Sequence, residues 1–169
     1  MEKWTQIETH TNYSISNIGE IKNNKTGKLL KKTIADCGYY RIGLYPNNKK
    51  IFIHTLVAKY FIPNPNPTEY TKIDHIDRNK LNNSLDNLRW CNNEINNANR
   101  CKIKKITSSK YKGVSWRKER YCWNVEIHIN KKRIHIGSFK DENDAGKSYN
   151  NYILEHHLEE YYTQNDIQI

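Results

Sequence analysis

Four polar side chains between residues 74 and 96 have types and an order that suit phosphodiester hydrolysis: Asp74, His75, Asn87 and Asn96. Hydrolysis requires that water lose a proton, that charge building on the phosphate be stabilised, and that the leaving 3′ oxygen be neutralised. A histidine, with an ordinary pKa of about 6.5, can accept the proton near neutral pH. A carboxylate can hold Mg²⁺ against the phosphate. Any one of these residues alone would more often belong to a polar turn or surface, so the inference depends on the whole spaced set.

A strand must carry the carboxylate and the imidazole to their place. The segment KIDH (72–75) reads as a strand, and neighbouring strand residues point to opposite faces. The strand must therefore end near Asp74 and His75 if both serve one site. The polar run DRNKLNNS that follows favours that ending.

Two helices are expected around this strand. The apolar spacing of IFIHTLVAKYF predicts a helix that stops before Pro63, because proline cannot continue a helix interior. His54, at the start of this helix, is expected to be structural. The stretch NNEINNANR predicts a second helix, with Asn92 or Asn93 as its N-cap.

The series Asp74-His75, then Asn87 in LDNLRW and Asn96 in NNEINNANR, resembles the HNH motif of bacteriophage intron-encoded homing endonucleases. The flanking runs IHTLVAKYFIPNP and NKLNNSLDNLRW match that family too, so the resemblance covers about residues 51–100. It implies a ββα-metal fold, in which a two-stranded hairpin and a helix grip one divalent ion. It also implies that His75 is the general base, that Asp74 and Asn96 bind the metal, and that Asn87 holds the loop and orients His75 through backbone hydrogen bonds.

One position departs from the commoner form of the motif. Many HNH enzymes have a third histidine where this chain has Asn96. An amide oxygen suits a hard cation better than zinc or nickel, so we expect Mg²⁺ or Mn²⁺ as the cofactor. The first 50 residues, with YSISNIGEI and GYYRIGL, resemble the strand-rich module that commonly precedes this motif in the same endonucleases.

The overall charge favours a polyanionic partner. The 169 residues carry a formal net charge of +10, and neutralising phosphates with Lys and Arg releases condensed counterions. Nucleic acid is the leading interpretation, and an acidic membrane surface or simple solubility are the alternatives. The four cysteines form no Cys-x-x-Cys pair, which excludes zinc-finger spacing and a disulfide framework. With no apolar leader or membrane-spanning run, we expect an intracellular protein of the cytoplasm, nucleoid or nucleus.

The segment from 101 to 110, CKIKKITSSK, is basic and has no periodicity. It is either a flexible linker or an extended strand on DNA, with Lys102, Lys104 and Lys105 on phosphates, and the sequence favours neither.

Residues 111–160 predict a second small fold. YKGVSWR, YCWNVEIHI and KRIHIGSF read as three strands joined by turns at KER and NKK, followed by a helix with Ala145 and Tyr149 on its apolar side. Alternation along the strands predicts one apolar face against the helix and one polar, cationic face. Trp116 and Trp123 are expected in the core.

This region resembles the plant ethylene-response-factor (APETALA-type) DNA-binding domain, which lays its three-stranded sheet in the major groove. Carried over by position, the DNA contacts fall on Lys112, Ser115, Arg117, Glu126, His128, Arg133 and His135. That family usually has arginine at the positions of Ser115 and His128 and tryptophan at that of His135, so its base preference does not transfer. Readout of the major groove by the sheet is the expectation that remains.

These observations predict an α+β protein with a β-rich module at 1–50, an HNH nuclease domain at 51–100, a basic linker at 101–110 and a DNA-binding domain at 111–160. The predicted function is a homing-type endonuclease that acts as a monomer on double-stranded DNA and nicks one strand, unless two copies assemble. No membrane partner and no small-molecule cofactor are expected. The alternatives are a transcription-factor-like DNA-binding protein with a relic HNH region and, third, a protein acting on RNA, whose deep A-form groove suits such a sheet poorly.

Overall fold

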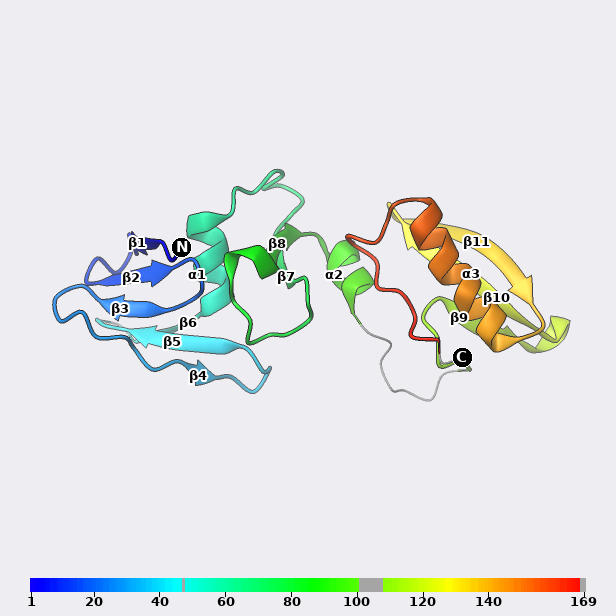
Figure 1. The fold of residues 1–169 in the computed structure, drawn as a ribbon, viewed down its shortest axis with the longest axis horizontal. Coiled ribbons are helices and arrows are strands. Elements are labelled where there is room, and N and C mark those ends of the chain that lie inside the picture. The colour runs from blue at the N-terminus through cyan, green and yellow to red at the C-terminus, as the bar shows by residue number, and fades with distance from the viewer. Residues whose placement is uncertain (47, 101–107, 168–169) are drawn as a thin grey trace. The chain divides into compact units, whose positions relative to one another are not determined.

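The computed structural model describes residues 1–46, 48–100 and 108–167 of the chain. The chain forms two compact units, Met1–Asn92 and Asn93–Ile169. The architecture is mixed α+β, with small antiparallel sheets and three helices within the described ranges (Figure 1). None of these helices has the length and apolar character that crossing a bilayer requires.

Two three-stranded antiparallel sheets open the N-terminal unit. The first contains β1 (Trp4–Gln6), β2 (Tyr13–Ser16) and β3 (Ile21–Asn23), and the second contains β4 (Thr33–Ile34), β5 (Tyr40–Leu44) and β6 (Lys49–Phe52). The strands of both sheets are short because turn residues interrupt the apolar pattern of the sequence every few positions.

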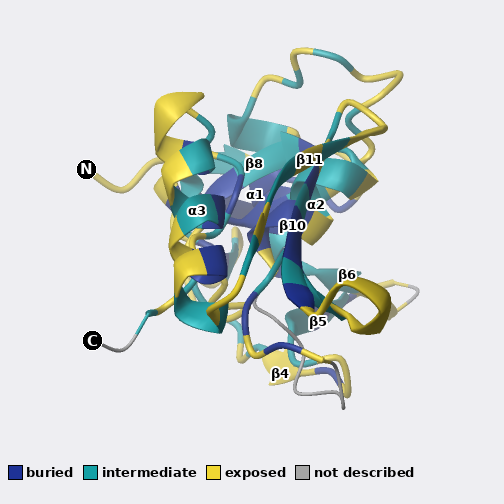
Figure 2. Cartoon of the chain, turned by 90° about the vertical axis from the view of Figure 1, so that its right-hand side faces the viewer, coloured by how far each residue is buried: buried dark blue, intermediate teal, exposed yellow. Residues whose placement is uncertain are grey.

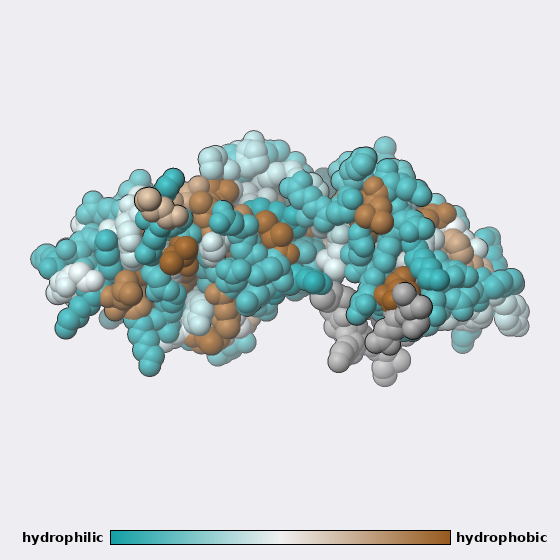
Figure 3. Space-filling view, in the orientation of Figure 1, coloured by the Kyte–Doolittle hydropathy of each residue, from teal (hydrophilic) through white to brown (hydrophobic). Residues whose placement is uncertain are grey.

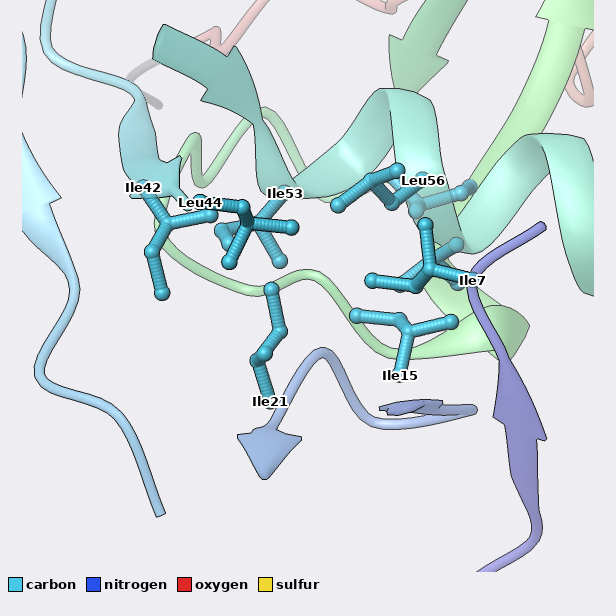
Figure 4. Close-up of a cluster of buried hydrophobic side chains, with 9 residues drawn as sticks. Ile7, Ile15, Ile21, Ile42, Leu44, Ile53 and Leu56 are labelled. Atoms are coloured by element: carbon cyan, nitrogen blue, oxygen red, sulfur yellow. The ribbon is translucent and has the colours of Figure 1, made fainter. Parts of the chain in front are cut away.

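Helix α1 (Ile53–Phe61) packs its apolar side against these sheets. Figure 4 shows isoleucines from different strands pointing toward Ile53 and Leu56 of the helix. The buried cluster consists of Ile7, Ile15, Ile21, Ile42, Leu44, Ile53, Leu56, Val57 and Leu88. The strands and α1 thus share one core. The division into a module at residues 1–50 and a nuclease domain at 51–100 stays a prediction.

The hairpin that carries the site consists of β7 (Lys72–His75) and β8 (Leu88–Cys91). They pair antiparallel, with Asp74 opposite Arg89 and His75 opposite Leu88. A long loop and a short 3₁₀ helix, η1 (Leu85–Asn87), connect them. Strand β7 ends at His75, as the polar sequence after it predicted.

The C-terminal unit begins with α2 (Asn93–Asn99) and then forms an antiparallel sheet in the order β11–β10–β9. The elements are β9 (Val114–Arg117), η2 (Lys118–Arg120), β10 (Cys122–Ile129), β11 (Lys132–Phe139) and α3 (Glu142–Glu155). These bounds agree with the three strands, the two turns and the helix that the sequence predicted.

One face of this sheet packs against α3. Figure 2 shows buried residues on the side of α3 toward β10 and exposed residues on its other side. The core includes Val125, Ile127, Ala145 and Tyr149, and Asp141 caps the helix by accepting hydrogen bonds from two backbone N–H groups. Gly113 is required where the strand meets the helix, because a Cβ there would lie 2.4 Å from the Tyr149 ring.

Figure 3 shows one face of each unit. Hydrophilic side chains cover most of this face, and apolar side chains appear on it in small, separate groups. Apolar residues scattered over a face in this way are ordinary for a folded protein.

Candidate active site

His75 stands at the end of β7 and is 4% exposed. Its Nε2 lies 3.2 Å from Oδ1 of Asn83, while Nδ2 of Asn83 donates to the carbonyl of Leu81 at 3.1 Å. Because Asn83 presents its oxygen to the ring, Nε2 of His75 must carry the proton, and the lone pair is on Nδ1. A neutral imidazole in this tautomer accepts a proton at Nδ1.

Burial is the main cause that lowers the pKa of His75 below its ordinary value. The hydrogen bond with Asn83 and the nearby carboxylates of Asp74 and Asp77 act in the opposite direction. The net shift keeps the imidazole neutral at neutral pH, so it can accept a proton.

The position of Asn83 depends on a close approach by the N-terminal sheet. Gly19 has φ +82°, and a Cβ built on it would lie 2.9 Å from the Cβ of Asn83. Only glycine adopts this backbone conformation readily and leaves room for the neighbouring chain. The turn between β2 and β3 therefore lies against the residue that anchors His75.

Asp74 is 6% exposed, and its carboxylate is held by Arg89 from the facing strand. Both Nε and Nη2 of Arg89 donate to Oδ2, at 3.0 and 2.7 Å. A buried carboxylate needs such a partner, since an uncompensated charge in this position would be strongly destabilising. Sequence reasoning missed Arg89, which stands directly opposite Asp74 in the hairpin.

Asn87 joins the two ends of the loop between β7 and β8. Its Oδ1 accepts from the backbone N–H of Asp77 at 2.9 Å, and its Nδ2 donates to Asp77 Oδ1 and to the carbonyl of Asn82, both at 2.8 Å. Its own carbonyl accepts from the N–H of Ile76 at 2.9 Å. Asn87 therefore connects the segment that follows His75 to the end of the same loop, and its predicted role in orienting His75 for catalysis stays a prediction.

The Asp77 carboxyl is part of the same network. Desolvation acts to raise its pKa, but hydrogen bonds from Asn82, from the N–H of Asn79 and from Asn87 together lower the pKa below its ordinary value. Asp77 therefore remains ionised and accepts the hydrogen bonds that shape the loop.

His54, in the first turn of α1, also lies beside His75. The two ring centroids are 5.2 Å apart with an interplanar angle of 72°. The pKa of His54 is lowered to about 4, mainly because the ring is buried and to a smaller extent because the imidazole of His75 lies beside it. Its contact with His75 could not be read from the sequence, which predicted only a structural role.

The second predicted metal ligand lies in the other unit. Asn96 is on α2, so its role beside Asp74 stays a prediction. Within the residues that the structure describes, no group of three or more His, Cys, Asp or Glu side chains is arranged to hold a metal ion. The predicted ligand pair of one carboxylate and one amide would not form such a group.

Six of the predicted DNA contacts lie on one face of the C-terminal sheet: Ser115, Arg117, Glu126, His128, Arg133 and His135. Strand register pairs Glu126 with His135 and His128 with Arg133, and the intervening residues Val125 and Ile127 belong to the core on the α3 side. Ser115 and Arg117 lie on the same polar face of β9. Glu126 lies between two arginines, 3.6 Å from Arg117 and 3.6 Å from Arg133.

A hollow of about 510 Å³ opens on this face, lined by Arg117, Glu119, Arg120, Asn124, Glu126 and His135. Arg120 and Asn124 were not among the predicted contacts. The strand register places Asn124 beside Ser115, and Arg120, on η2, lines the same hollow.

Lys112 has a different partner. Its Nζ donates to the carbonyls of Ala98 and Arg100 near the end of α2, the second at 3.1 Å. This ammonium therefore caps a helix within the protein. Lys102, Lys104 and Lys105 fall outside the described residues, so their predicted contacts stay predictions.

Comparison with known proteins gives two matches along the N-terminal part of the chain. Residues 52–98 match the family model of an HNH endonuclease, and residues 2–45 match the NUMOD4 motif. An uncharacterised HNH endonuclease of Acanthamoeba polyphaga mimivirus is 39% identical over 148 residues, which is 85% of this chain and 39% of the relative.

Phage enzymes are similar over a shorter stretch. The DNA endonuclease I-HmuI of Bacillus phage SP01 is 42% identical over 57% of this chain and 56% of its own length. The H-N-H endonuclease F-TflII of Escherichia phage T5 is 38% identical over 52% of this chain and 47% of its own. The solved structure titled as DNA binding and cleavage by the HNH homing endonuclease I-HmuI has a TM-score of 0.51 at 40% identity, covering 57% of this chain and 56% of that one.

The chain thus spans about half the length of these phage relatives and less of the viral one. The two family models match residues 2–45 and 52–98, and the likeness of the C-terminal sheet to the ethylene-response-factor domain stays a prediction. Residues 52–98 thus resemble an HNH endonuclease and residues 2–45 the NUMOD4 motif, and the chain is similar to phage HNH endonucleases over about half of its own length.

Proposed function

We propose that this chain is a site-specific DNA endonuclease of the homing type, which hydrolyses a phosphodiester bond. The observation that carries the proposal is the buried pair Asp74 and His75 at the end of β7, inside the segment that matches the HNH endonuclease model. The relatives named as DNA endonucleases and the structural likeness to I-HmuI support the same conclusion.

In this proposal His75 is the general base. Asn83 accepts a hydrogen bond from Nε2, so Nδ1 takes the proton from the attacking water. The loop held by Asn87 fixes the backbone immediately after His75, because the N–H of Ile76 and that of Asp77 both bind Asn87. The imidazole is thereby fixed before substrate arrives, which lowers the cost of reaching the reactive geometry.

The predicted ligands suit a hard divalent cation, since a carboxylate and an amide oxygen are ligands that Mg²⁺ and Mn²⁺ accept. Asp74 and Asn96 would hold it, and Arg89 would orient the Asp74 carboxylate. When bound, the cation supplies Lewis-acid stabilisation of the charge on the phosphate and on the leaving 3′ oxygen.

The polar face of the C-terminal sheet is the proposed reader of the major groove. Arginine and histidine side chains from all three strands project from it, around the half-buried carboxylate of Glu126. We assign the DNA contacts to Ser115, Arg117, Glu126, His128, Arg133 and His135, and the capping of α2 to Lys112. With one HNH segment per chain, a monomer would nick one strand.

The test is cleavage-site mapping on a library of duplex DNA in the presence of Mg²⁺, Mn²⁺ or a chelator. The proposal predicts nicks at a small number of sequences, with 5′-phosphate and 3′-hydroxyl ends, that disappear when the chelator is added. Tight binding to DNA with no strand break in either metal would instead support the non-catalytic DNA-binding protein. Preferred binding to duplex RNA in competition with duplex DNA would support the third alternative.

A further inference from the structure

The imidazole of His75 lies against two rings that the proposed hydrolysis does not use. The ring centroids of His75 and Tyr39 are 5.6 Å apart, those of His75 and His54 are 5.2 Å apart, and those of Tyr39 and His54 are 4.8 Å apart. Each ring therefore contacts the other two. We call these three residues the ring cluster.

His54 contributes to this cluster by packing. Its ring also stacks on Phe52, at 5.5 Å and an interplanar angle of 19°. Its Nδ1 is buried and has no hydrogen-bond partner among the described residues. A hydrogen bond from Nδ1 to a described residue is therefore not what holds the ring in place. The lowered pKa also keeps His54 uncharged at neutral pH, so it adds no second positive charge beside His75.

Tyr39 reaches the cluster from the segment that matches the NUMOD4 motif. Lys80, in the loop that follows β7, fastens this part of the chain. Its Nζ lies 4.8 Å from the centroid of the Tyr39 ring and donates to the carbonyl of Cys37 at 2.9 Å. The loop around Tyr39 and the loop after His75 are thus tied together within the N-terminal unit.

We propose that His54 and Tyr39 are positioning residues for the general base. The hydrogen bond to Asn83 holds one edge of the His75 ring. The rings of His54 and Tyr39 pack against the His75 ring from two other segments and restrict its tilt. The NUMOD4-matching segment thereby contributes to catalysis through Tyr39. This inference rests on the proposed nuclease function.

The experiment measures nicking of DNA by the full chain with Mn²⁺, for the variants His54→Ala, His54→Phe, Tyr39→Ala and Tyr39→Phe. We expect each alanine variant to lower kcat about 10- to 100-fold, because a displacement of about 1 Å at a reacting group has an effect of that size. KM and DNA affinity should stay unchanged. Each phenylalanine variant keeps a ring and should keep most of the rate.

A double-mutant cycle shows whether the effect passes through His75. In a His75→Ala background, His54→Ala should cause no further loss, because the residue that it positions is already absent. His156→Ala is the matched control: it removes an imidazole stacked on an aromatic ring, Tyr152, in the C-terminal unit. It should cleave at the wild-type rate.

The outcomes separate this inference from the function on which it rests. If the wild-type chain cuts no DNA, the proposed function itself is wrong. A wild-type chain that cuts, with alanine variants as fast, overturns the positioning role alone. An equal loss in His54→Phe and His54→Ala, or a full additive loss in the His75→Ala background, also overturns it. If His54→Ala does not fold, the Tyr39 pair of variants gives the same decision.

Discussion

The side chain of Asn87 offers the sharpest test of how the site is built, through the variant Asn87→Ala. Asn87 is 7% exposed and makes three side-chain hydrogen bonds, two to Asp77 and one to Asn82. At about 0.5–1.5 kcal/mol each, their loss would lower the free energy of loop opening by about 1.5–4.5 kcal/mol. Because Asp77 is exposed, water can replace some of these partners, so we expect a value of about 2 kcal/mol.

Native-state hydrogen exchange measures this opening directly. The N–H of Asp77 binds Oδ1 of Asn87, and a loss of about 2 kcal/mol corresponds to about 30-fold faster exchange of that amide. The exchange of the Ile127 amide, in the C-terminal core, should not change. Exchange at Asp77 that is equally slow in Asn87→Ala would refute the claim that Asn87 holds the loop.

A second substitution at the same position adds a charge test. In Asn87→Asp a carboxylate would replace the amide that donates to Asp77 Oδ1 at 2.8 Å, so two carboxylates would face each other. Their repulsion is present only when both are ionised. We expect the exchange defect of this variant to grow as the pH rises from about 4 to 6, whereas the Asn87→Ala defect should stay constant over that range.

Three further predictions concern the buried charged and titratable groups of the N-terminal unit. Arg89→Met should lower the free energy of unfolding by about 3–5 kcal/mol, because it leaves the Asp74 carboxylate buried without its partner. A urea titration at neutral pH measures this change, and an unchanged midpoint would contradict the pairing. Since the pKa of His54 is about 4 in the folded protein and about 6.5 when unfolded, the unfolded chain takes up the proton first. Stability from this group should be constant above about pH 6.5 and decline toward pH 4, and that decline should be smaller in His54→Phe. Burial raises the pKa of the Cys91 thiol to about 12, whereas Cys37 is exposed. Iodoacetamide at pH 8 should therefore modify Cys37 and leave Cys91 unmodified, and mass spectrometry of the treated protein measures both.

Much of the fold follows from local pattern in the sequence. The helical spacing of apolar residues before Pro63 predicted α1, and the polar residues after His75 predicted that β7 ends there. In the C-terminal unit the alternation of β10 placed Glu126 and His128 on the polar face, as predicted. These features depend on residues close together in the chain, which is why periodicity is enough to predict them.

The parts that could not be predicted depend on contacts between distant segments. Arg89 meets Asp74 only because of the hairpin register, which the length of the intervening loop leaves open. Tyr39 and His54 meet His75 because two sheets and α1 share one core. Lys112, a predicted DNA contact, donates to carbonyls near the end of α2, at residues that lie 14 and 12 positions earlier in the chain. A pattern of single residues carries no signal for any of these pairings.

The central claim is that His75 acts as the general base of a DNA endonuclease. The measurement that tests it is the initial rate of nicking of one supercoiled DNA substrate by the wild-type chain and by His75→Ala, at saturating Mn²⁺, with DNA affinity measured in parallel. We expect the nicking rate of His75→Ala to be about 10²- to 10⁴-fold lower than that of the wild-type chain, with DNA affinity unchanged. Equal rates for the two proteins would contradict it.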